Sequence, residues 1–169
     1  EGLFSLSVID KCDRIFIIEP NGFFNRSLKR TFSDFLGIVK IYNLGVGDKV
    51  GKFSLNEKSI SSTFRGIPAA YVVTTIDELF YNKQKISFLK ADIEGFEIKM
   101  LRGAVNTIKK NKPKIAITTY HSENSPNEII DFILQNVPEY KFCVKGIEHW
   151  SGKPVMIHFW VEDNISMIE

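Results

Sequence analysis

Acidic side chains and one histidine stand directly after the apolar runs of this 169-residue sequence. They are Glu19, Asp48, Asp92, Glu94 and His121. An ionised carboxylate only accepts hydrogen bonds, so it can hold two neighbouring hydroxyls, such as those of a ribose. A carboxylate or an imidazole within reach of a hydroxyl can also remove its proton. The pattern therefore indicates binding of a hydroxylated ligand and proton transfer, provided that the fold gathers these side chains.

Two of these positions also have a structural interpretation. Glu19 either accepts hydrogen bonds from ribose hydroxyls or stabilises the helix that follows it through the helix dipole, and the residues alone leave both open. Gly47 and Asp48 stand before Lys49 in a pattern that is typical of a plain turn. Their spacing favours that turn over the alternative, in which they form one wall of an adenine pocket.

Asp92 and Glu94 stand at the entry to a predicted helix, and His121 follows a predicted strand. Asp92 either caps the helix, with Glu94 in its first turn, or lies at a reaction centre as a base, a hydroxyl acceptor or a metal ligand. A single Asp without an evident partner ligand disfavours a metal site, so we expect none. A histidine at a strand end suits proton transfer better than a core histidine, although a lone histidine is more often an ordinary surface residue.

Short apolar runs rich in β-branched residues predict strands buried on both faces, as in a parallel sheet covered by helices. They span residues 15–19, 39–46, 86–91 and 114–120, and an extra short strand is expected at 50–56. The runs 140–145 and 154–162 predict an antiparallel pair. We therefore expect one α/β domain over residues 1–169, with a mainly parallel sheet flanked by helices and a C-terminal antiparallel pair.

Helical spacing and capping residues predict the helices between these strands. An apolar stripe over residues 24–35 should end at Gly37, which suits a left-handed C-cap. A capping box that begins at Thr75 predicts a short helix. One long helix should carry the stripe from 98 to 108, and Ser125 should cap a further helix. Because the carboxyl ends of the strands form the ligand edge of an open α/β sheet, these elements should bring the acidic residues together.

Composition and charge exclude several classes of protein. With 22 basic and 20 acidic residues the net charge is +2, so the polybasic footprint of nucleic-acid binding is missing. No apolar run approaches the ~18–20 residues of a membrane span, so no membrane partner is expected. Cys12 and Cys143 fit two thiols in a reducing compartment better than a disulfide framework or a metal site, which favours the cytoplasm. The sequence leaves the oligomeric state open.

Residues 90–97, KADIEGFE, resemble the K-x-D-[IV]-E-G-x-E signature of FkbM-type methyltransferases. Four further pieces stand in the order seen in that family, and the resemblance covers essentially the whole chain. They are IFIIEPN, VKIYNLGVGDKVGKFSL, TTIDEL and KPKIAITTYH. The resemblance implies a Rossmann-like class I fold that binds S-adenosylmethionine. It also implies methylation of a hydroxyl oxygen, often on a sugar or secondary metabolite, so the partner would be a small-molecule or glycan acceptor.

The resemblance also implies roles for individual residues. Glu19 matches the family's ribose-binding acid, Asn21 follows in the same loop, and Gly47 with Asp48 falls near the adenine edge. Asp92 and Glu94 fall in the signature turn that faces the methyl donor and the acceptor, with Asp92 the first choice to orient or deprotonate the acceptor. His121 is similar to a polar residue at the end of its strand and is the second choice. These side chains should converge on a single pocket.

The first residues depart from the family pattern. The family's first strand and its D-x-G-A-N-x-G loop should lie immediately upstream, and Gly2 resembles the tail of that cofactor-binding loop. We expect that upstream residues exist, although a rearranged sheet or another chain in the same place are alternatives. A binding or scaffold module without catalysis is a second hypothesis for the function. A dinucleotide-dependent nucleotide-sugar enzyme is a third, but the sequence contains no GxGxxG.

Overall fold

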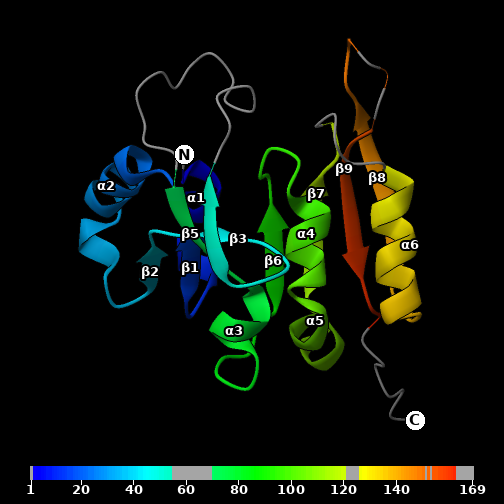
Figure 1. Cartoon of the computed structure of the whole chain (residues 1–169), viewed down its shortest axis with the longest axis horizontal. Helices are drawn as coiled ribbons and strands as arrows, with labels where there is room; N and C mark the ends of the chain where they lie inside the picture. Colours follow the sequence, from blue (N-terminus) through cyan, green and yellow to red (C-terminus); the bar gives the residue numbers. More distant parts are fainter. Residues whose placement is uncertain (1, 55–69, 121–125, 151, 153, 163–169) are drawn as a thin grey trace. The chain divides into compact units, whose positions relative to one another are not determined.

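The computed structural model describes residues 2–54, 70–120, 126–150, 152 and 154–162. The chain divides into two compact units, Glu1–Thr74 and Thr75–Glu169, and each is described by itself. Figure 1 shows the helices and strands of both units. The prediction that the whole chain is one domain stays a prediction. Every helix among the described residues falls short of the length and apolar character that a membrane crossing demands.

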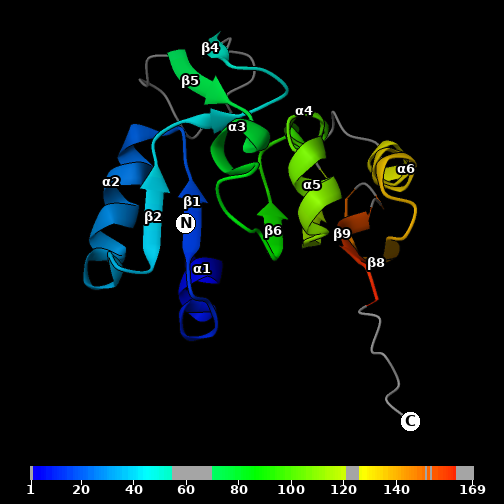
Figure 2. The ribbon, with the colours of Figure 1, turned by 90° about the horizontal axis from the view of Figure 1, so that it is seen from below.

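The first unit contains two small sheets and two α-helices in its described part. Its elements are α1 (Leu3–Ser7), η1 (Ile9–Lys11), β1 (Ile15–Ile18), α2 (Gly22–Thr31), η2 (Ser33–Phe35), β2 (Val39–Tyr42), β3 (Gly45–Val46), β4 (Gly51–Ser54) and β5 (Ala70–Thr74). β1 and β2 pair in parallel, with α2 beside β2 (Figure 2). The second sheet has the order β3-β5-β4, in which β3 is parallel and β4 antiparallel to β5.

The core of the first unit explains the glycine at position 2. Leu28 and Phe32 on the α2 side are buried together with Ile9 and Val39. Gly2 lies against this cluster with a left-handed φ of 79°, and a Cβ there would lie only 2.7 Å from Leu28 Cδ2. A side chain at this position would therefore meet both a steric overlap and an unfavourable backbone conformation.

Two sequence predictions for the first unit are wrong in detail. The run 39–46 forms two strands, because the chain leaves β2 after Tyr42 and β3 pairs with β5 instead. The helix predicted to end at Gly37 ends at Thr31 instead. The N–H of the next residue, Phe32, donates to the carbonyls of Leu28 and Arg30. Residues 33–35 then continue the apolar spacing as a 3₁₀ turn. The extra strand at 50–56 is confirmed as β4, whereas β5 was not predicted.

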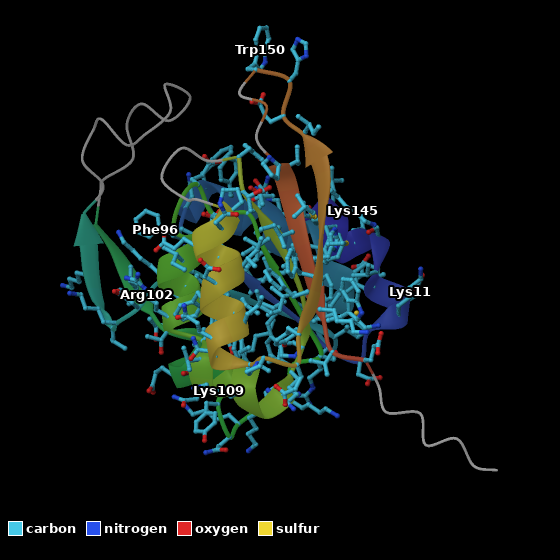
Figure 3. The ribbon with its side chains drawn as sticks, turned by 90° about the vertical axis from the view of Figure 1, so that its right-hand side faces the viewer. Lys11, Phe96, Arg102, Lys109, Lys145 and Trp150 are labelled. Atoms are coloured by element: carbon cyan, nitrogen blue, oxygen red, sulfur yellow. The ribbon has the colours of Figure 1, made fainter. Side chains whose placement is uncertain are left out.

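The second unit contains a four-stranded mixed sheet. Its elements are α3 (Ile76–Phe80), β6 (Phe88–Ala91), α4 (Glu97–Arg102), α5 (Val105–Asn111), β7 (Lys114–Thr118), α6 (Pro126–Asn136), β8 (Lys141–Ile147) and β9 (Pro154–Trp160). The strand order is β6-β7-β9-β8, with β6 and β7 parallel and β9 antiparallel to both neighbours. α4 and α6 lie side by side on one face of this sheet (Figure 3).

These pairings confirm part of the predicted fold class. The α/β alternation and the C-terminal antiparallel pair are present. A mainly parallel sheet is not confirmed, because both sheets of more than two strands are mixed. The proposed cap at Ser125 lies outside the described residues, but the helix that it was expected to begin is present as α6.

The prediction of one long helix over 98–108 is wrong, because the chain forms two helices there, α4 and α5. Asp77 stabilises the break between them by hydrogen bonds. Its backbone N–H donates to the carbonyl of Gly103, 2.8 Å away, just after α4 ends. Its carboxylate accepts from the backbone N–H groups of Asn106 and Thr107, at 3.0 and 2.7 Å, in the first turn of α5. One residue of α3 thus satisfies donors and acceptors that a helix break exposes. The predicted apolar stripe is nevertheless buried at Ile98 and Ile108.

We expect Asp77→Ala to lower the free energy of unfolding by about 2 kcal/mol, because two backbone N–H groups at the start of α5 lose their acceptor. Urea unfolding measures this loss. The control is Glu78→Ala, whose carboxylate forms an exposed pair with Lys83 and should change the free energy of unfolding by less than about 0.5 kcal/mol. Equal losses in the two variants would show that Asp77 does not hold the break.

Candidate active site

Asp92 lies at the carboxyl end of β6, next to the end of β7. In the parallel pairing, Ala91 stands opposite Ile117, so Asp92 and Thr118 come next in register. The Thr118 hydroxyl donates to Asp92 Oδ1 at 3.1 Å. Asp92 is exposed whereas the strand residue before it is buried. The register therefore places a solvent-accessible carboxylate at the edge where ligands of α/β sheets bind.

Tyr120 brings a second hydroxyl to the same carboxylate. Because side chains alternate along an extended chain, Thr118 and Tyr120 extend to the same side. The Tyr120 hydroxyl donates to Asp92 Oδ1 at 3.5 Å. Burial, followed by the charges of Asp92 and Glu94, raises the pKa of Tyr120 above its ordinary value. The hydroxyl thus stays a protonated donor at neutral pH.

The turn after Asp92 is held in an unusual backbone conformation. Glu94 has a φ of 55°, which is rare outside glycine, and Gly95 follows with a φ of 97°. The Ile93 N–H donates to Glu97 Oε1 at 2.9 Å, and Glu97 has no exposed surface. A buried carboxylate on the first turn of α4 thereby fixes the loop that carries Asp92 and Glu94.

The structure decides against the capping alternative for Asp92. α4 begins at Glu97, its N-cap is Phe96, and no side chain caps it. Phe96 lies near the start of α4, where the Lys99 ammonium stands 4.6 Å from its ring centroid (Figure 3). Asp92 instead accepts hydrogen bonds from the hydroxyls of Thr118, on β7, and Tyr120, just after β7. The carboxylate is therefore presented at the sheet edge.

In the first unit, Glu19 and Asn21 lie in the loop after β1. Glu19 Oε1 accepts from the Asn21 N–H at 2.7 Å, and the Asn21 side chain accepts from the Phe23 N–H as the N-cap of α2. The Asn43 amide donates to the carbonyls of Glu19 and Pro20, each at 3.0 Å. The loop is thus fixed from two sides, and a half-buried carboxylate lies at the strand end, as the sequence predicts.

Gly47 and Asp48 follow β3. The Gly47 N–H donates to the Thr74 carbonyl at 2.9 Å, and a Cβ on Gly47 would lie 3.1 Å from Val73 Cγ1. Close packing against β5 therefore favours glycine at position 47 for a structural reason, independent of any role in binding a ligand. Asp48 is exposed in the bend that follows. This agrees with the turn that the spacing favours.

The predicted site residues thus fall into two groups. Gly2, Glu19, Asn21, Gly47 and Asp48 belong to the first unit, and Asp92 and Glu94 belong to the second. His121 lies outside the described residues. The predicted convergence of these side chains on a single pocket stays a prediction.

Sequence reasoning missed three residues beside Asp92: Glu97, Thr118 and Tyr120. Alternation along 114–120 could have indicated that the last two face the same way. The buried state of Glu97 had no signal in the sequence, because acidic residues in a first helical turn are usually exposed. Within the described residues, no group of three or more His, Cys, Asp or Glu side chains could hold a metal ion.

We expect Glu94→Gly to raise the free energy of unfolding by about 1 kcal/mol, because glycine adopts a positive φ without steric cost. The control is Asn82→Gly at a φ of 58°, which should gain less because asparagine tolerates this conformation. Denaturant unfolding of both variants is the measurement. A loss of stability in Glu94→Gly would mean that contacts of the side chain outweigh the strain.

Known proteins share both sequence and fold with this chain. The family model described as "Methyltransferase FkbM domain" matches residues 3–142. The crystal structure of methyltransferase FkbM from Methylobacillus flagellatus KT is similar, with 23% sequence identity and a TM-score of 0.73. The similarity covers 94% of this chain and 40% of that chain, so this chain spans less than half of the other's length. No curated protein matches the sequence.

Proposed function

The chain belongs to the FkbM methyltransferase domain family, and from this premise we propose that it is an S-adenosylmethionine-dependent O-methyltransferase. The acceptor that we propose is a hydroxyl group of a small molecule or glycan. The observation that carries the proposal is the exposed Asp92 carboxylate, held by two hydroxyls at the carboxyl end of β6. A group in this place can bind and deprotonate an acceptor hydroxyl.

The acidic residues of the chain fit S-adenosylmethionine by their chemistry. Glu19 is an acceptor at a strand end and suits ribose hydroxyls, as carboxylates do in nucleotide-binding sheets. Asp92 and Glu94 place two carboxylates in one turn, which suits a cationic ligand. When bound, this cofactor would supply a methyl group activated by a positively charged sulfur.

Asp92 has two tasks in the proposed reaction. It accepts a hydrogen bond from the acceptor hydroxyl and so orients the oxygen towards the methyl carbon, and orientation of this kind is a large part of catalysis. It also takes the hydroxyl proton as the oxygen–carbon bond forms and the sulfur–methyl bond breaks. Proton removal by a positioned carboxylate contributes about 10²–10⁴-fold to a rate. His121 is the second candidate for this base.

We expect Asp92→Asn to lower the rate of methyl transfer by about 10²–10⁴-fold, while affinity for S-adenosylmethionine changes only a few-fold, because the amide cannot take a proton. Radiolabelled S-adenosylmethionine with a panel of sugar and phenolic acceptors measures transfer, and calorimetry measures binding. The control is Asp131→Asn, which removes an exposed carboxylate on α6.

An unchanged transfer rate in Asp92→Asn would remove Asp92 from the mechanism. Binding of S-adenosylmethionine by the wild type without transfer to any acceptor would instead favour the binding module that the sequence left as an alternative.

A further inference from the structure

Tyr120 is one of the three side chains beside Asp92 for which the sequence suggested no role. We propose that Tyr120 is a positioning residue, whose hydroxyl holds the Asp92 carboxylate in the orientation that receives the acceptor's proton. The proposal rests on the proposed function, in which Asp92 is the base. It adds that Asp92 depends on two hydroxyls, one from Thr118 at the end of β7 and one from Tyr120 just after it.

Geometry is the first support for this role. The hydroxyls of Thr118 and Tyr120 both donate to the same atom, Asp92 Oδ1, at 3.1 and 3.5 Å. A carboxylate rotates easily about its terminal bond, and that torsion is broad when nothing restrains it. Two donors on one oxygen restrain this rotation, so they also set the direction in which the other oxygen points.

The charges around Tyr120 are the second support. Burial, followed by the negative charges of Asp92, Glu94 and Glu97, raises the pKa of the Tyr120 hydroxyl. Lys90 is an exposed cation on β6. The three negative charges disfavour loss of the phenolic proton, so Tyr120 remains a donor. Asp92 is then the group of this pair that can accept a proton from the acceptor, since the tyrosine already holds its own.

Two other tyrosines of this unit show that the arrangement at Tyr120 is specific. Tyr140 is buried, and its hydroxyl donates to the Pro113 carbonyl at 2.7 Å, as in an ordinary core tyrosine. Tyr81 is 38% exposed, the same fraction as Tyr120, but its ring lies near the Lys110 ammonium. Of these three tyrosines, Tyr120 combines partial exposure with a carboxylate partner.

The contact is tested by titrating the tyrosines of the whole chain, labelled with carbon-13 at Cζ, by NMR. Loss of one resonance in Tyr120→Phe assigns Tyr120. Because Asp92 is one of the charges that raise the pKa of Tyr120, Asp92→Asn should shift this pKa down towards the ordinary value. Tyr140 serves as an internal reference that should not move, and Glu128→Gln is the control variant. An unmoved Tyr120 titration in Asp92→Asn overturns the proposal.

The positioning role is tested by Tyr120→Phe, which keeps the ring and removes the hydroxyl. We expect kcat for methyl transfer to fall by about ten- to a hundredfold, in line with loss of a hydrogen bond to a charged group. KM for S-adenosylmethionine and the thermal midpoint should stay close to the wild type. The matched control is Tyr81→Phe, which should leave kcat unchanged.

The outcomes separate the two proposals. If the wild type transfers methyl groups and Tyr120→Phe does so at the same rate, the positioning role is wrong while the proposed function stands. If the wild type transfers to no acceptor, the proposed function fails and the positioning role falls with it, although the titration still shows whether the two side chains interact.

Discussion

The parallel pairing of β6 with β7 is the interaction on which the candidate site depends. It sets Ala91 opposite Ile117, and so it brings Asp92 to Thr118 and places Tyr120 within reach. A slip by one residue would turn every side chain of β6 to the other face, because the side-chain period of a strand is two. The buried residues of both strands specify this register, so the same apolar contacts that stabilise the sheet also position the carboxylate.

In the second unit, two carboxylates accept hydrogen bonds from the backbone at places where the chain departs from regular structure. Glu97 accepts a backbone N–H inside the turn after β6, where Glu94 has its positive φ, and Asp77 accepts two in the first turn of α5. Hydrogen bonds to a charged acceptor are stronger than those between neutral groups, so they can offset local strain. In the second unit, acidic side chains therefore serve local structure as well as the candidate chemistry.

The sequence predicts the features that depend on neighbours along the chain. The cores of the predicted strands and the hairpin of β8 and β9 follow from apolar runs, and Asp92 could be singled out because it ends one of them. The break between α4 and α5 could not be predicted, because it depends on Asp77, about thirty residues away. Glu97 and Tyr120 were missed for a similar reason. Their roles arise from burial and from a partner on another element, which periodicity does not encode.

Three carboxylates within six residues would repel one another unless each had its own compensation. Glu97 accepts a backbone N–H and Asp92 accepts from two hydroxyls, while Glu94 is exposed to solvent, which screens its charge. These hydrogen bonds disperse the negative charge of the turn. Carboxylates in general favour a nearby cation and can take a proton from a neutral hydroxyl. The proposed reaction needs both properties, because its methyl donor is cationic and its acceptor is neutral.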